Sequence, residues 1–166
     1  MRGDVRRFFL ATAVLSAAAP AGAQAVPRPR PYPEGRIDYL GPDPHAVHVG
    51  LGLNVPVGTY LRVGAIAAGG ASWDAGRSGA SARADLIARF SFDPFRERRW
   101  GVSAGGGLSV RYDRIASEGE RWRPLLALVV DLEGPRKGFV APALQAGLGG
   151  GGRVGAIIRR AHADRR

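Results

Sequence analysis

The chain has 166 residues, no cysteine, 25 glycines and 12 prolines, which fits a single domain and excludes a disulfide framework or a cysteine-based metal site. Its formal charge is +10, from 24 basic and 14 acidic residues, and Lys137 is the one lysine. The arginines are dispersed through strand-like and turn-like segments, with no basic helix or aromatic RNA-binding motif, so we predict no nucleic-acid partner.

Residues 1–25 read as a cleavable signal peptide. Arg2, Arg6 and Arg7 form a basic start, and the apolar residues 8–19 are too few to cross a membrane as a helix. Ala-x-Ala sites within residues 21–25 place cleavage after Ala23 or Ala25, which predicts an exported protein. The arginine pair also resembles the core of a twin-arginine signal, so the sequence leaves open both the general secretory route and the twin-arginine route.

The next two segments lead into the folded part. Residues 26–34 hold four prolines and are expected to form an extended leader. Residues 35–40 form a weak strand with Ile37 and Tyr39 on one face, and the Gly-Pro-Asp-Pro sequence at 41–44 is a turn signal.

Alternation of apolar and polar residues then recurs along the chain. It predicts strands over residues 45–55, 57–68, 80–92, 100–113, 121–133, 139–148 and 153–160. The clearest pair is the hairpin 80–113, where alternate residues from Ala80 to Phe92 and from Trp100 to Tyr112 are apolar or glycine. Its strands are longer than the roughly 5–6 residues of soluble sandwiches and match the about 9–11 that a bilayer requires.

Sequential hairpins of this kind predict an all-β fold: an antiparallel, eight-stranded up-and-down barrel over residues 35–160, followed by a polar tail at 161–166. Closure removes exposed sheet edges. We expect short turns at 54–57, 93–99 and 133–138 on the side of both termini, and longer loops at 69–79 and 114–120 on the other side, as in membrane barrels.

The polar face of these strands carries charge. An eight-stranded barrel has an interior that side chains fill, and charges buried there must pair. We therefore predict an interior network of arginine–carboxylate pairs, with Gly50, Gly52, Gly64, Gly105 and Gly107 making room for long side chains. Its expected members are Arg62, Arg83, Asp85, Arg89, Arg111, Asp113, Arg123, Asp131 and Glu133.

The apolar face ends in aromatic residues, which suggest membrane interfaces. Phe92 and Trp100 are expected in an aromatic girdle at one interface, and Tyr112 and Trp122 at the other. Cations on the side of the termini either touch anionic lipid head groups or form a solvated rim. They are Arg96, Arg98, Arg99, Arg136, Lys137, Arg159 and Arg160.

Taken together, the export signal, the lack of cysteine, the glycine-rich alternating strands and the charged short turns resemble the small outer-membrane β-barrels of Gram-negative bacteria. The membrane domain of outer membrane protein A-type proteins is of this kind. The resemblance covers about residues 35–160 and is one of pattern. It implies transmembrane β-strands, a location in the outer membrane and contact with its lipids.

No catalytic constellation stands out, and we predict no catalytic residue, metal or cofactor. His45 and His48 fall on opposite faces of one strand, which argues against a shared metal. We expect a structural or interaction role with a narrow, filled interior. The alternative is a soluble periplasmic barrel with inverted faces that binds a small apolar ligand, and a barrel lipid hydrolase is a third option. Alternation shows that each strand has one apolar face. It does not show whether that face points outward to lipid or inward to form an apolar core.

Overall fold

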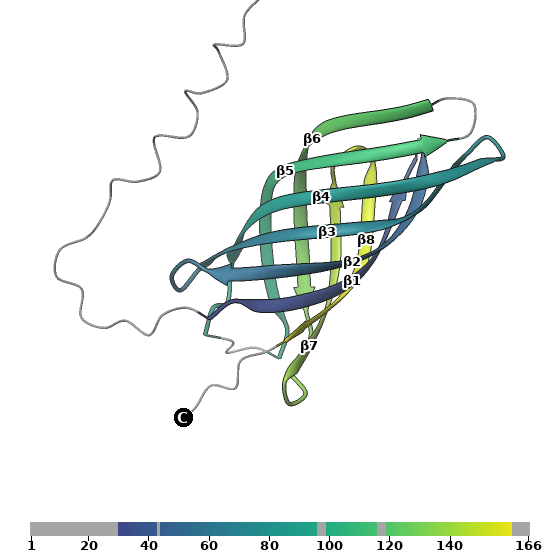
Figure 1. Ribbon diagram of the computed structural model, residues 1–166. Helices are drawn as coiled ribbons and strands as arrows, with labels where there is room; N and C mark the ends of the chain where they lie inside the picture. The colour runs from purple at the N-terminus through teal and green to yellow at the C-terminus, as the bar shows by residue number, and fades with distance from the viewer. Residues whose placement is uncertain (1–29, 43, 96–98, 116–118, 161–166) are drawn as a thin grey trace, which may run out of the picture.

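The computed structural model describes residues 30–42, 44–95, 99–115 and 119–160, and the predicted signal peptide and polar tail lie outside these ranges (Figure 1). Within them, eight antiparallel strands form one closed barrel, as the alternation predicts. The strands are β1 (Tyr32–Gly41), β2 (His45–Pro56), β3 (Leu61–Asp74), β4 (Arg77–Ser91), β5 (Gly101–Ile115), β6 (Gly119–Glu133), β7 (Val140–Leu148) and β8 (Gly152–Arg160). No helix in the described ranges is long and apolar enough to cross a membrane.

The barrel closes between its first and last strands. β1 pairs with β8 in antiparallel register, with Glu34 opposite Arg159 and Tyr39 opposite Val154. The weak predicted strand is therefore a full strand, and it begins three residues earlier than expected, at Tyr32. Because β1 begins and β8 ends beside each other, we call this the terminal end of the barrel and the opposite one the hairpin end.

The hairpin end corrects the predicted loops. Residues 69–79 were expected to form a loop, but the ladder between β3 and β4 continues to the pair Asp74 and Arg77. A two-residue turn remains, in which Ala75 (φ 46°) and Gly76 (φ 79°) both have positive φ, as in the tight turns that match strand twist. The charged loop at 114–120 is likewise mostly strand, with Arg114 opposite Glu120. The residues here are mostly small or polar and do not alternate with large apolar residues. The sequence pattern therefore does not predict that the strands extend this far.

The expected distribution of short and long connections is also wrong. At the hairpin end the connections are residues 42–44, 75–76, 116–118 and 149–151, each two or three residues long. At the terminal end they are residues 57–60, 92–100 and 134–139, and these are longer. Extension of β3 to β6 toward the hairpin end shortens its turns, which is visible as the long strand pairs in Figure 1.

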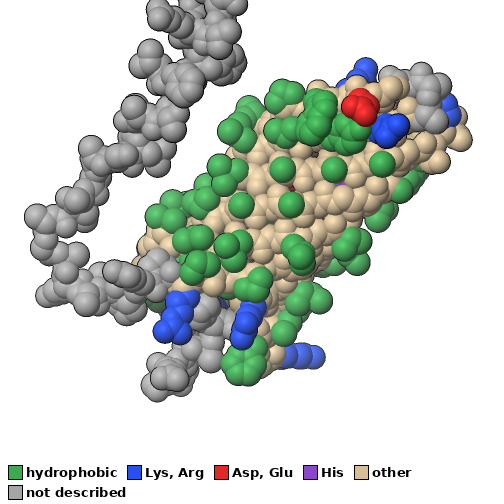
Figure 2. Space-filling model, viewed as in Figure 1, with side chains coloured by type: hydrophobic (Ala, Val, Ile, Leu, Met, Phe, Trp, Pro, Cys, Tyr) green, Lys and Arg blue, Asp and Glu red, His purple; other side chains and the backbone are tan. Residues whose placement is uncertain are grey.

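Strand alternation places charge inside and apolar side chains outside. On β4, Arg83, Asp85 and Arg89 are at most 4% exposed, whereas Leu86 is 53% exposed. In the view of Figure 2, hydrophobic side chains are spread over the whole body of the barrel, and the visible charged ones gather near its two ends. The inverted arrangement required by the soluble, apolar-ligand alternative is therefore absent from the described strands.

The inward glycines have two different roles. A Cβ on Gly64 would lie 2.7 Å from Oδ1 of Asn54 and 2.8 Å from Nη1 of Arg89, so this glycine makes room for a hydrogen-bonded pair that includes an arginine. A Cβ on Gly105 or Gly107 would instead lie within about 2 Å of the backbone oxygen of Ala88 or Leu86, respectively. These two glycines permit close approach of β4 and β5, and arginine does not explain them.

Candidate functional site

The charged interior is the candidate site, and the structure places all nine predicted residues on its lining. Seven are buried, while Arg62 and Arg123 are half-buried near the terminal and hairpin ends, respectively. The seven are Arg83, Asp85, Arg89, Arg111, Asp113, Asp131 and Glu133. The lining also includes charged residues that we did not predict.

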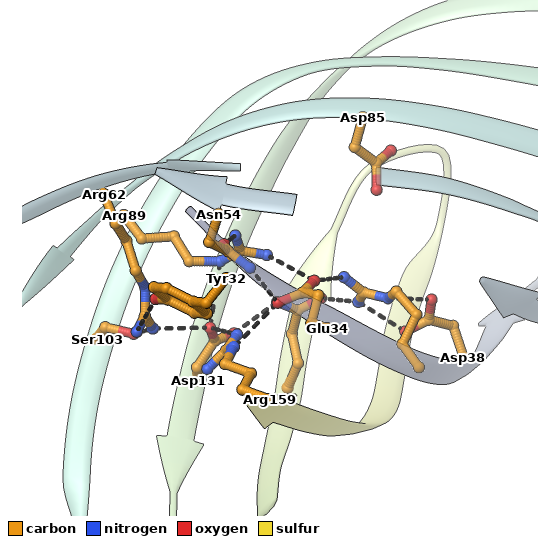
Figure 3. A network of polar contacts seen from close by, with 12 residues as sticks. Tyr32, Glu34, Asp38, Asn54, Arg62, Asp85, Arg89, Ser103, Asp131 and Arg159 are labelled. Atoms are coloured by element: carbon orange, nitrogen blue, oxygen red, sulfur yellow. Dashed lines mark hydrogen bonds and ion pairs between the residues drawn. The ribbon is translucent and has the colours of Figure 1, made fainter. Parts of the chain in front are cut away.

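The terminal-end cluster is organised around Arg159 on β8. Its guanidinium group donates from Nε to Oε2 of Glu34 (2.9 Å), from Nη2 to Oδ2 of Asp131 (2.5 Å) and from Nη1 to Oε1 of Glu133 (2.6 Å). Figure 3 shows Arg159 between Glu34 and Asp131. One arginine thus joins β1, β6 and β8, with its three nitrogens all used.

Two further arginines complete the terminal-end cluster. Arg62 on β3 forms ion pairs with Glu133 and, at 3.4 Å, with Asp131. The Nε of Arg89 lies 3.2 Å from Oδ2 of Asp131. Its Nη1 donates to Oδ1 of Asn54 (3.2 Å). We define the cluster as three arginines and three carboxylates, namely Arg62, Arg89, Arg159, Glu34, Asp131 and Glu133.

Asp38 is one centre of the hairpin-end cluster. Arg36 grips its carboxylate with two donors, Nε to Oδ2 at 2.7 Å and Nη2 to Oδ1 at 2.8 Å. From across the barrel, Nη2 of Arg83 on β4 reaches the same Oδ2 at 2.6 Å. Two-donor contacts of this kind are the stronger, better oriented arginine–carboxylate pairs.

Asp85 is the second centre of the hairpin-end cluster. It accepts Nη1 of Arg153 (2.9 Å) and the hydroxyl of Ser109 (2.6 Å), and Nε of Arg83 lies 3.0 Å away. Gln145 links this cluster to the terminal-end one: its oxygen accepts from Arg153 at 2.5 Å, and its amide donates to Asp131 at 2.5 Å. Contacts therefore run continuously along the lumen.

Asp113 closes the hairpin-end cluster at its outer edge. Its carboxylate accepts from Nε of Arg111 (3.0 Å), Nη2 of Arg123 (2.6 Å) and the hydroxyl of Ser81 (2.7 Å). We define this cluster as four arginines and three aspartates: Arg36, Arg83, Arg111, Arg153, Asp38, Asp85 and Asp113.

Ser81, Asp113 and His48 superficially suggest a hydrolase. His48 Nε2 lies 2.8 Å from the hydroxyl of Ser81, which donates to Asp113. In a catalytic triad the carboxylate holds the histidine and the serine faces substrate. Here the carboxylate holds the serine instead, and Ser81 and His48 are at most 3% exposed. This arrangement supports a structural hydrogen-bond chain.

Five charged residues of the interior were missed by the sequence reasoning, although strand parity identifies them. With Ile37 and Tyr39 outside, every second residue of β1 faces inward, and the same holds on β8 when Val154 and Ile158 are outside. The five are Glu34, Arg36, Asp38, Arg153 and Arg159. The sequence predicts that Arg159 is one of the cations that either touch lipid head groups or form a solvated rim; its burial and three ion pairs show that this prediction is wrong for Arg159.

Part of the interior wall is apolar. Ile66, Ile87, Ala127 and Val129 form a buried cluster across β3, β4 and β6. Val129 interrupted the expected alternation of residues 121–133 because it is an apolar residue that points inward. The charged clusters thus lie beside a packed apolar wall, and side chains fill the middle of the lumen.

The predicted girdle residues lie on the outer face or in the connection beside it. Phe92, Trp100 and Trp122 are 63%, 54% and 66% exposed, and Tyr112 packs against Trp122 with ring centroids 4.8 Å apart. Phe92 also contacts Phe90 edge-to-face. The aromatic pairs mark both ends of the apolar outer surface.

Exposed cations occur at the terminal end. They are Arg99, Arg136, Lys137 and Arg160, whereas Arg96 and Arg98 lie outside the described residues. In the described ranges, no group of three or more histidine or acidic side chains is arranged to hold a metal ion.

A search of solved structures finds a protein with a similar fold. The chain resembles the crystal structure of Neisserial surface protein A with a TM-score of 0.54 and 11% identity, over 80% of this chain and 96% of that one. No family model matches the sequence, and no curated protein matches it. The similarity is therefore one of barrel architecture.

Proposed function

We propose that this protein is an outer-membrane β-barrel that crosses the bilayer with its apolar outer face and has a structural or interaction role without catalysis. The observation that carries the proposal is the distribution of charge, inside and paired, with apolar side chains outside. Water cannot satisfy polar groups in a bilayer core, so a closed barrel with this distribution suits lipid. The structural neighbour that shares this barrel fold is, by its name, a surface protein, Neisserial surface protein A.

The height of the apolar surface supports this proposal. On β5 the outward positions run from Val102 to Tyr112 without a charged residue, and Arg114 follows. Ten residues of strand span about 33 Å. At a tilt near 40°, this gives roughly 25 Å along the barrel axis, which is the usual height of the lipid-facing band.

Anionic lipid head groups are the proposed partners at the terminal end. Arg99, Lys137 and Arg160 are exposed there, at the same end of the barrel as the exposed aromatic residues Phe92 and Trp100. Cations beside an aromatic interface are suited to phosphate oxygens. This part of the proposal needs no specific ligand.

The filled lumen argues against a general diffusion pore. Arg159 on β8 pairs with Asp131 on β6, Arg83 on β4 reaches Asp38 on β1, and the apolar cluster occupies part of the remaining wall. Eight strands leave room for side chains but not for a wide channel. We therefore propose no solute transport.

Membrane fractionation tests the location. The full chain, expressed in a Gram-negative host, should sediment with outer membranes and migrate faster on a denaturing gel when unheated than when boiled, because a closed barrel resists the detergent. Recovery in the soluble periplasmic fraction, with identical mobility before and after boiling, would contradict the proposal.

A further inference from the structure

We propose that the hairpin-end cluster holds one small inorganic anion, of the size of chloride, between Arg83 and Arg111. This inference concerns the interior and does not depend on which membrane surrounds the barrel. Its basis is an excess of positive charge at a position where buried donors lack partners.

The first observation is the charge balance. In the described strands, the two clusters together hold seven arginines and six carboxylates, and Arg36 pairs with a carboxylate of each cluster, Glu34 and Asp38. Asp113 is further shared with Arg123, at 2.6 Å. A buried charge without a counter-charge is costly, so one monovalent anion would balance the two clusters.

The second observation is the register of the arginines. Arg83 on β4 lies directly opposite Arg111 on β5, and Arg111 lies opposite Arg123 on β6. Like charges in direct cross-strand register destabilise a sheet. An anion bound between these arginines would offset the repulsion of their charges. A row of arginines in register is therefore expected beside an anion site.

The third observation is a set of buried donors. Nη1 of Arg83, Nη1 of Arg111 and the hydroxyl of Ser72 have no hydrogen-bond partner, although these residues are at most 4% exposed. Buried polar groups in proteins are nearly always paired with protein, water or an ion. Two guanidinium donors and a hydroxyl are suitable ligands for an anion.

Arg83 faces Arg111 across the ladder between β4 and β5, and the side chain of Arg111 extends toward the level of Ser72. Nη2 of Arg111 donates to the backbone oxygen of Pro44 (3.0 Å), two residues before Ala46, which is the register partner of Ser72. Arg83 reaches Asp38, the register partner of His48 on the same wall. A cavity of about 320 Å³ at the hairpin end is lined by Pro44 and Asp113, and both of these residues accept hydrogen bonds from Arg111.

Thermal unfolding in detergent micelles tests the site, with the full chain at fixed pH and ionic strength. Replacing gluconate with chloride should raise the unfolding midpoint by a few degrees and saturate, since a ligand that binds only the folded state stabilises it. Ser72→Ala should weaken the apparent chloride affinity several-fold, and Arg111→Lys should abolish the shift. Ser103→Ala and Arg62→Lys, at the terminal end, are the matched controls and should keep the shift.

Crystals of the unmutated protein grown in bromide give an independent test. An anomalous peak between Arg83 and Arg111 is the expected result. Absence of any such peak in the lumen, or a chloride shift of equal size in Arg111→Lys, would overturn the proposal; the first outcome would assign the donors to water and the second would place the salt effect elsewhere.

Discussion

Glu34 on the first strand and Arg159 on the last are register partners, and their side chains form a 2.9 Å ion pair inside the barrel. The pair therefore joins the seam at which the barrel closes. Because both side chains are buried, the pair is weak evidence for net stability, but removal of one partner leaves the other uncompensated.

Substitution at this seam should destabilise the barrel strongly. In Glu34→Ala, Asn54 loses its acceptor and Arg159 keeps only Asp131 and Glu133. We expect a loss of about 3–5 kcal/mol in the free energy of unfolding, measured by urea titration in lipid vesicles. Glu120→Ala, at an exposed position, is the control and should change stability little. Equal stability of both variants would show that the seam pair does not matter.

A backbone prediction concerns the tight turn at the hairpin end. Ala75 has φ 46°, a left-handed conformation that costs a residue with a Cβ about 1 kcal/mol or more. Ala75→Asn should stabilise the protein by about 0.5–1 kcal/mol, because asparagine tolerates this conformation. Gly76→Ala should have the opposite effect, since φ is 79° there. A lower urea midpoint for Ala75→Asn would contradict this turn geometry.

A packing prediction concerns Gly155 on β8. A Cβ there would lie 2.1 Å from Oδ1 of Asp38, a carboxylate that Arg36 and Arg83 hold in place. Gly155→Ala should cost about 1–3 kcal/mol, as other overpacked interiors do. Gly35→Ala is the matched control on the facing strand, because an added Cβ meets nothing within 4 Å. The urea midpoint should fall for the first variant and remain unchanged for the second.

Membrane insertion should depend on the outer face. Leu86 is 53% exposed at the middle of β4, and Ser78 is exposed near the hairpin turn of the same strand. An arginine in the middle of a lipid-facing strand costs about 2–4 kcal/mol, and near the interface about 0–1. Leu86→Arg should therefore reduce the fraction of heat-resistant, membrane-inserted protein, whereas Ser78→Arg should not. Equal insertion of the two variants would argue against lipid at Leu86.

The sequence predicts the strands and their faces because alternation is a local property. Ala80 to Tyr112 gives the period directly, and the positions of Arg83, Asp85 and Arg89 follow from it. The partners of these residues do not follow, because Arg83 meets Asp38 from a strand three places away around the barrel. Such contacts depend on closure and on the stagger of the strands, which no local pattern contains.

Other features were missed for equally physical reasons. The end of β3, up to Asp74, consists mostly of small and polar residues. These residues show no alternation of apolar and polar side chains, so the sequence does not predict that the strand continues there. Strand β1 has only Ile37 and Tyr39 as large outward apolar residues before Leu40. Glu34 fell in the predicted leader, and Asp38 lay in a predicted strand too weak to assign an inward face. The terminal-end cluster therefore could not be predicted, because its members Glu34 and Arg159 lie on β1 and β8, which meet only when the barrel closes.

The most direct test of the account measures what surrounds Leu86. The chain has no cysteine, so Leu86→Cys and Ser78→Cys each give one site for a spin label. In the folded protein in lipid vesicles, the label at 86 should be accessible to oxygen, which concentrates in the bilayer, and shielded from a water-soluble nickel chelate; the label at 78 should show the reverse. Access of the nickel chelate to position 86 equal to that at position 78 would contradict a membrane-spanning barrel.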